Sequence, residues 1–140
     1  MDKNKVKSVI GSIFTLILVL LAVYSILGVL NQKKTGELFF FFGYRPVVIL
    51  SGSMEDTLET GAIAVTKETK DIKEGDIIFF EGEGDVPVIH RCVRIEGDKY
   101  YTKGDANAKE DWDSITKDRI YGKVVYRCNA VASIVRNFID

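Results

Sequence analysis

The chain has 140 residues, a formal net charge of −1, two cysteines and one histidine. This length suffices for one compact domain, and not for two once a membrane segment is subtracted. Lysine and arginine are scattered rather than clustered, which excludes a basic nucleic-acid-binding surface. The cysteines lack the spacing of a metal knuckle and one histidine cannot complete a zinc site, so we expect no metal and no cofactor.

Residues 9–30, VIGSIFTLILVLLAVYSILGVL, contain no charged residue. About 22 residues at 1.5 Å per residue span the roughly 30 Å hydrocarbon core of a bilayer, so this stretch predicts a transmembrane helix. A cleaved secretory signal would have a shorter apolar region and a small-residue cleavage site, whereas the polar sequence NQKK follows here and favours a retained anchor. Three lysines precede the helix and two follow it, so the charges only slightly favour a cytoplasmic position for residues 1–8.

Residues 31–43 are expected to form a membrane-proximal linker that contains four adjacent phenylalanines, Phe39 to Phe42. Alternate side chains of a strand point to opposite faces, so the four rings cannot all face one core. They either form a strand that is buried on both faces or meet lipid beside the anchor. The sequence gives these two alternatives equal support.

Residues 44–140 consist of short β-rich runs separated by Gly, Asp and Asn clusters, which predict a mostly β domain. Glu96-Gly97-Asp98 joins two runs at hairpin spacing and favours antiparallel pairing. We therefore expect a small antiparallel β-sheet or partial barrel with one N-terminal transmembrane helix. The predicted strands are residues 45–50, 62–67, 77–81, 86–96, 99–102 and 120–128.

Two further segments of this domain have no strand pattern. Residues 104–118 are acidic and lack a helix or strand period, so they predict a long loop of the kind that often carries function. Residues 131–139 are apolar but interrupted by an arginine and an asparagine, and they are too short to span a bilayer.

The segment Ser51-Gly52-Ser53 follows an apolar run, residues 47–50, at the end of a predicted strand. A glycine between two hydroxyl residues lets the backbone turn sharply and leave a serine hydroxyl exposed, as a nucleophile requires. The same composition is common in ordinary turns, so this segment alone does not establish a catalytic serine.

His90 lies in the apolar run of residues 86–93, where a lone histidine is more often a hydrogen-bonded core residue than a catalyst. It is nevertheless the one histidine that could activate a serine, because a neutral imidazole can take a hydroxyl proton near pH 7. Such a pair also needs an acid that orients the imidazole. The loop supplies Asp105, Asp111 and Asp113, which would otherwise form a solvated acidic surface.

Three segments together resemble the type I signal peptidases. Residues 51–58 resemble their serine box, Ile89-His90-Arg91 resembles their base box, and residues 103–107 followed by Asp111 resemble their acidic box. A histidine in the place of a lysine resembles the endoplasmic-reticulum and archaeal branch, which some Gram-positive bacteria also carry. The order, the spacing and the preceding anchor match, and the three boxes are specific only in combination.

The resemblance implies a membrane-bound serine endopeptidase, a hydrolase that removes signal peptides from exported preproteins through an acyl-enzyme. Ser53 would be the nucleophile and His90 the general base. Asp111 would be the preferred acid partner of His90, while Asp105 would either share that role or hold the loop. Ser51 and the backbone N–H of Ser53 would form the oxyanion hole.

The resemblance also implies small residues one and three positions before the cut, in a peptide bound as an added β-strand. The implied partners are signal peptides, the lipid bilayer, and accessory or secretion-translocon subunits. The implied location is the cell membrane, or the endoplasmic-reticulum membrane in a eukaryote, as a single-pass protein with the peptidase domain of residues 44–140 outside the cytoplasm. The alternative is a tethered module that binds extended peptides without cleaving them, or an inactive relative.

Five further residues carry expectations of their own. Met54 either lines a substrate pocket or packs in the core, and Trp112 either shields Asp111 or anchors the loop. An oxidising compartment would permit a disulfide between Cys92 and Cys128, although we favour two buried thiols. Asp56 stands where the family usually has proline, so the rigidity of the turn after Ser53 is less certain.

Overall fold

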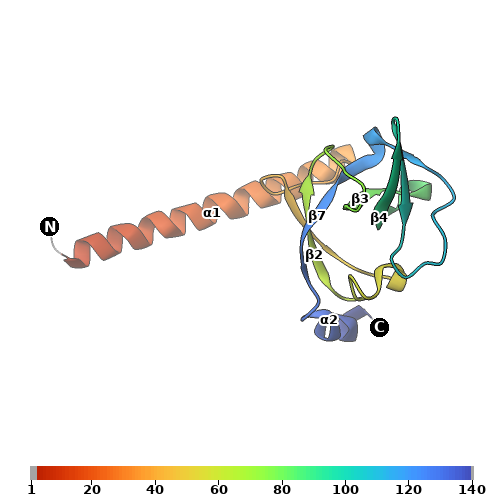
Figure 1. Cartoon of the computed structure of the whole chain (residues 1–140). Helices are drawn as coiled ribbons and strands as arrows, with labels where there is room; N and C mark the ends of the chain where they lie inside the picture. Colours follow the sequence, from red (N-terminus) through yellow and green to blue (C-terminus); the bar gives the residue numbers. More distant parts are fainter. Residues whose placement is uncertain (1–2, 140) are drawn as a thin grey trace. The chain divides into compact units, whose positions relative to one another are not determined.

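The computed structural model describes residues 3–139 and divides into two units, Met1–Phe41 and Phe42–Asp140 (Figure 1). The first unit contains α1 (Lys3–Thr35), a helix that extends beyond the predicted residues 9–30 at both ends. Its apolar part reaches a mean hydropathy of 2.8 and is not buried, so α1 could cross a membrane by length and composition. The helix ends at Thr35, and the following Gly36 has a φ of 73° and donates its N–H to the carbonyl of Gln32.

The phenylalanine run does not form the predicted two-sided strand. The rings of Phe39 and Phe41 pack against Tyr24 of α1, with centroid distances of 5.6 and 5.4 Å. Phe42 has a φ of 50° and an exposed side chain, and residues 36–40 have no strand geometry. The strand alternative is therefore wrong, and contact of the exposed rings with lipid stays a prediction.

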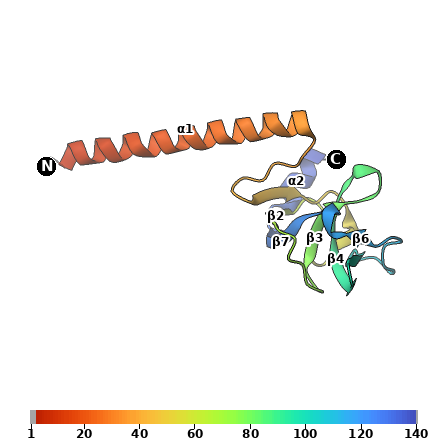
Figure 2. The ribbon, with the colours of Figure 1, turned by 90° about the horizontal axis from the view of Figure 1, so that it is seen from above.

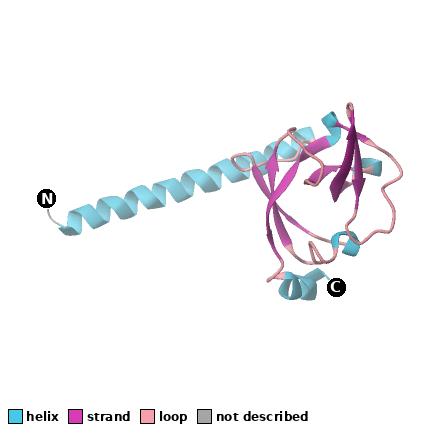
Figure 3. Ribbon diagram, in the orientation of Figure 1, coloured by secondary structure: helices cyan, strands magenta, loops and turns pink. Residues whose placement is uncertain are grey.

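The second unit is built on one curled, antiparallel sheet of seven strands, in the order β1-β2-β7-β3-β4-β5-β6 (Figure 3). This confirms the mostly β, antiparallel prediction, and each predicted strand occurs with its ends shifted by no more than two residues. Figure 2 shows β3 lying between β7 and β4. The strands are β1 (Tyr44–Val48), β2 (Ile63–Glu68), β3 (Ile77–Glu81), β4 (Pro87–Glu96), β5 (Lys99–Lys103), β6 (Ile115–Thr116) and β7 (Ile120–Cys128).

Two short elements were not predicted. β6 lies inside the segment expected to be a loop and pairs with β5 through only two residue pairs. Helix α2 (Ala132–Ile139) follows β7 and buries Ala132 against the sheet. Gly61 makes this approach possible, because a Cβ there would lie 2.5 Å from the carbonyl oxygen of Ala132.

Two apolar clusters of buried residues form the core of this unit. The first is formed mainly by strands β3, β4, β5 and β7, with Ile78, Phe80, Cys92 and Ile120 among its members. The second lies where β1 and β2 meet the serine segment and α2, and it consists of Ile49, Met54, Leu58, Ala62, Ala64 and Ala132. The serine segment is therefore packed on a core of its own.

Candidate active site

Ser53 lies in the 3₁₀ turn η1 (Gly52–Met54), which begins after the extended residue Ser51. Met54 is 1% exposed and Leu58 is fully buried, so the turn is held to the second cluster. The backbone N–H of Leu58 also donates to the carbonyl of Met54 at 2.7 Å. Burying Met54 leaves the neighbouring Ser53 at the surface of the turn, partly exposed.

Three side chains from separate segments form a continuous chain of hydrogen bonds. His90 Nε2 lies 3.0 Å from Ser53 Oγ, and His90 Nδ1 lies 2.7 Å from Asp111 Oδ2. The imidazole is only 13% exposed, so water does not compete freely for either nitrogen. With the proton on Nδ1 donated to Asp111, Nε2 can accept the hydroxyl proton of Ser53.

The imidazole is held by β4 and its neighbours in the sheet. His90 is paired with Ile78 of β3, and its ring contacts Phe80 at a centroid distance of 6.5 Å. Cys92, two residues further along β4, is fully buried in the first cluster, so its thiol packs in the core and burial raises its pKa. Cys92 and Cys128 are both free thiols, as we favoured, but Cys128 is only partly buried.

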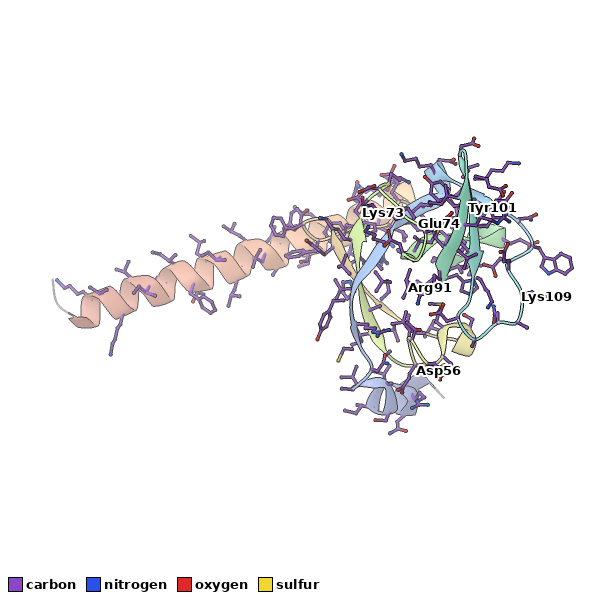
Figure 4. All side chains as sticks on the ribbon, in the orientation of Figure 1. Asp56, Lys73, Glu74, Arg91, Tyr101 and Lys109 are labelled. Carbon is purple, nitrogen blue, oxygen red and sulfur yellow. The ribbon has the colours of Figure 1, made fainter. Side chains whose placement is uncertain are left out.

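Asp105 does not contact His90. Its carboxylate accepts two hydrogen bonds from Arg91, at 2.8 Å from Nε and 2.6 Å from Nη2. This pairing holds the pKa of Asp105 below its usual value and raises that of Arg91. Arg91 also donates to the carbonyl of Gly75 at 2.7 Å, and Figure 4 shows its side chain leaving β4 toward the end of the unit where η1 lies.

The loop that carries the two aspartates packs directly on the backbone of the serine turn. The N–H of Ala106 donates to the carbonyl of Ser53 at 2.9 Å, and the N–H of Asp105 contacts the sulfur of Met54 at 3.4 Å. Gly104 touches the same carbonyl so closely that a Cβ would lie 2.5 Å from it. Met54 is therefore a core residue beneath the loop, and its buried side chain has no surface to offer a bound peptide.

Ser51 lies next to the Ser53 hydroxyl. The two side-chain oxygens are 3.2 Å apart, and Ser51 is exposed. A hydroxyl at this distance can donate to an oxygen that approaches Ser53. The described residues contain no group of three His, Cys, Asp or Glu side chains that could hold a metal ion.

The family comparison matches the model described as signal peptidase, peptidase S26, to residues 6–106 of this chain. The chain belongs to this family. The matched region includes Ser53 and His90 and ends before Asp111.

Three curated relatives give the same family by sequence. Signal peptidase I W of Bacillus subtilis is 38% identical over 115 residues, which are 77% of this chain and 58% of the relative. The signal peptidase complex catalytic subunit SEC11 of Pyricularia oryzae is 35% identical over 97 residues, covering 64% and 55% of the two chains. SEC11 of Lodderomyces elongisporus is 34% identical over 99 residues, covering 66% and 58%. This signal peptidase family member thus spans a little over half the length of these relatives.

This family member forms the turn after Ser53 without the expected proline. Asp56 has a φ of 71°, which proline cannot adopt because its ring fixes φ near −65°. Glu55, at φ −48° and ψ 154°, and Asp56 occupy the centre of a tight turn closed by the N–H of Thr57 on the carbonyl of Met54, at 3.1 Å. The left-handed backbone at residue 56 therefore requires a residue other than proline there.

The contact of Thr102 with the site was not predicted from the sequence, and the role expected of Trp112 was wrong. Thr102 Oγ1 donates to Asp111 Oδ2 at 2.6 Å, and the only sequence signal for it is a threonine in the strand that leads into the acidic box. Trp112 is fully exposed, so it neither shields Asp111 nor anchors the loop, and both alternatives are wrong. Asp113 is exposed as well and takes no part in the site.

Proposed function

We propose that this chain is a membrane-anchored serine endopeptidase that cleaves signal peptides from exported preproteins. The observation that carries the proposal is the unbroken hydrogen-bond chain from Ser53 through His90 to Asp111. Membership of the signal peptidase family supports the substrate class. A non-catalytic peptide-binding module would not need a hydroxyl, an imidazole and a carboxylate in this sequence of contacts.

The chemistry would proceed through an acyl-enzyme. Ser53 Oγ attacks the scissile carbonyl carbon while its proton passes to His90 Nε2, and Asp111 stabilises the resulting imidazolium. When the tetrahedral intermediate breaks, the C–N bond is cleaved and the proton passes from His90 to the leaving amine. A water molecule, deprotonated by the same imidazole, then hydrolyses the ester and regenerates Ser53.

The charge that develops on the carbonyl oxygen would be stabilised by the N–H of Ser53 and the hydroxyl of Ser51. The 3.2 Å between the two serine oxygens supports this role, because it keeps the second hydroxyl beside the reacting one. Loss of one such donor typically costs about 10²–10³ in rate.

The substrate would bind as an extended strand. β1 is an edge strand of the sheet and leads directly into Ser51, so a peptide that pairs with β1 would pass Ser53. Small side chains one and three positions before the cut would face the domain, since alternate residues of a strand share a face. The position of β1 at one end of the strand order supports this mode of binding.

The proposed arrangement places residues 1–8 in the cytoplasm, residues 9–30 in the membrane, residues 31–43 beside it and residues 44–140 outside the cytoplasm, where signal peptides emerge. The exposed, apolar α1 supports the membrane anchor. The relatives named SEC11 are catalytic subunits of a signal peptidase complex, which supports accessory subunits as partners here.

The test is cleavage of a preprotein by the 140-residue chain reconstituted in lipid vesicles. Ser53→Ala should lower kcat by about 10⁴- to 10⁶-fold, because it removes the hydroxyl that is hydrogen-bonded to His90 Nε2. Ser133→Ala is a matched control, since Ser133 is an exposed serine of α2 and takes no part in the site. Unchanged processing by Ser53→Ala would refute the proposal.

A further inference from the structure

Thr102 makes a hydrogen bond that lies outside the Ser53–His90–Asp111 chain. Its Oγ1 donates to Asp111 Oδ2 at 2.6 Å, and this same oxygen is the one 2.7 Å from His90 Nδ1. Thr102 is 1% exposed, so its hydroxyl has no alternative partner in solvent. A buried polar group without a partner is destabilising, which favours keeping this bond formed.

Thr102 also holds the backbone of the acid. The N–H of Asp111 donates to the carbonyl of Thr102 at 2.8 Å. One residue thus fixes Asp111 at two points, its main chain and its carboxylate. A loop residue held in this way keeps its carboxylate in one orientation.

The sheet explains why Thr102 can reach the site. Thr102 of β5 is paired with Cys92 of β4, and His90 precedes Cys92 by two residues. Alternate residues of a strand share a face, so the threonine hydroxyl and the imidazole lie on the same face of neighbouring strands. Asp111 Oδ2 therefore accepts one hydrogen bond from His90 of β4 and one from Thr102 of β5.

We propose that Thr102 is a positioning residue for Asp111. Its hydroxyl keeps Oδ2 aimed at His90 Nδ1, which fixes the imidazole tautomer whose Nε2 can accept the proton of Ser53. The inference rests on the proposed peptidase function for its kinetic consequence, but the effect on the imidazole is a property of the resting protein. Functional groups held by a second layer of hydrogen bonds keep the productive geometry.

The kinetic test compares Thr102→Val, which removes the hydroxyl at nearly constant shape, with Thr102→Ser, which retains it. Thr102→Val should lower kcat by about tenfold to a hundredfold with KM little changed, short of the roughly 10⁴-fold typical when the acid itself is replaced. Thr102→Ser should restore most of kcat. Thr66→Val is the matched control, because Thr66 is a fully buried threonine whose hydroxyl donates to the carbonyl of Arg45 at 3.0 Å, away from the site.

The second measurement does not depend on turnover. His90 is the only histidine, so ¹⁵N-histidine labelling of the full-length chain in detergent gives a single imidazole whose nitrogen shifts report the tautomer. The wild-type chain and Thr66→Val should hold the proton on Nδ1, and Thr102→Val should show a mixture of tautomers. If the wild-type chain cleaves nothing, the proposed function fails while this measurement still tests Thr102.

The proposal is overturned by wild-type kcat and a wild-type tautomer in Thr102→Val. It is equally overturned if Thr102→Ser is as impaired as Thr102→Val, because the hydroxyl would then not be the cause. Should Thr102→Val fail to fold, Thr102→Ala and Thr102→Ser make the same comparison with a smaller side chain.

Discussion

Gly104 lies against the backbone of the serine turn, where a side chain would not fit. A Cβ there would lie 2.5 Å from the carbonyl oxygen of Ser53 and 2.7 Å from the side-chain nitrogen of Asn107. The first of these neighbours is backbone and cannot rotate away as a long side chain could. The absence of a side chain therefore lets the acidic loop rest directly on the backbone of the serine turn.

Gly104→Ala should displace the Ser53 backbone and lower kcat by about tenfold to a hundredfold, since a shift of about 1 Å at a reacting group can cost 10²-fold in rate. Steady-state cleavage of a preprotein measures this loss. Gly11→Ala is the matched control, because a Cβ at Gly11 meets no atom within 4 Å, and it should leave kcat unchanged. Wild-type kcat in Gly104→Ala would mean that the loop can retreat freely and does not hold the turn.

An ion pair between Arg91 and Asp105 is one of the contacts that join β4 to the acidic loop. Arg91 and Asp105 are joined by two hydrogen bonds, and the paired side chains are 31% and 18% exposed. The bonds to Arg91 are the largest cause that lowers the pKa of Asp105 below 3.8. Because the carboxyl pKa is lower in the folded state, the ion pair stabilises the fold fully at pH values above the unfolded-state pKa. This stabilisation is lost as the pH falls through the folded-state pKa.

Asp105→Asn should therefore reduce the free energy of unfolding by about 1–2 kcal/mol at pH 7, the range for a charged hydrogen bond that is partly open to water. The difference from wild type should hold between pH 7 and pH 5 and shrink below pH 4, because wild-type Asp105 then takes up its proton. Urea unfolding of the detergent-solubilised chain across this range measures the difference. Other acids that titrate there are common to both chains and cancel. A difference that stays constant down to pH 2 would contradict the assignment.

The elements differ in how well they could be predicted. Strands such as β3 and β7 are rich in β-branched and aromatic residues and are bounded by turn residues, so their local pattern is sufficient. The two residues of β6 and the eight of α2 are too short to be stable by themselves, so tertiary packing decides whether they form. The acid that contacts His90 could not be predicted from the sequence alone, because it depends on tertiary contacts. Asp105 pairs with Arg91, and Asp111 is the aspartate that contacts the imidazole.

At the scale of the whole molecule, the two units differ in where their apolar side chains lie. The apolar clusters of the β-rich unit are formed entirely by residues after Phe42, whereas the apolar part of α1 is not buried. Hydropathy alone was therefore sufficient to predict the helix. The site, in contrast, forms only when the fold brings His90 to Ser53, 37 residues away in the sequence, and to Asp111, 21 residues away. The residues of the proposed chemistry belong to one unit and the proposed membrane anchor belongs to the other.

This division predicts that a chain of residues 42–140 folds without α1 and cleaves a short soluble peptide with the kcat/KM of the full chain. On a preprotein embedded in vesicles, the same truncated chain should be slower by about 10²- to 10⁴-fold, because tethering to a common membrane raises the effective concentration of the two partners. Replacing α1 with an unrelated apolar helix of equal length should restore the rate, since the tether requires hydrophobicity and not a particular sequence. Equal rates of the truncated and full chains on the embedded preprotein would show that the anchor contributes nothing to catalysis. Loss of activity on the soluble peptide would show instead that α1 is needed to hold the site.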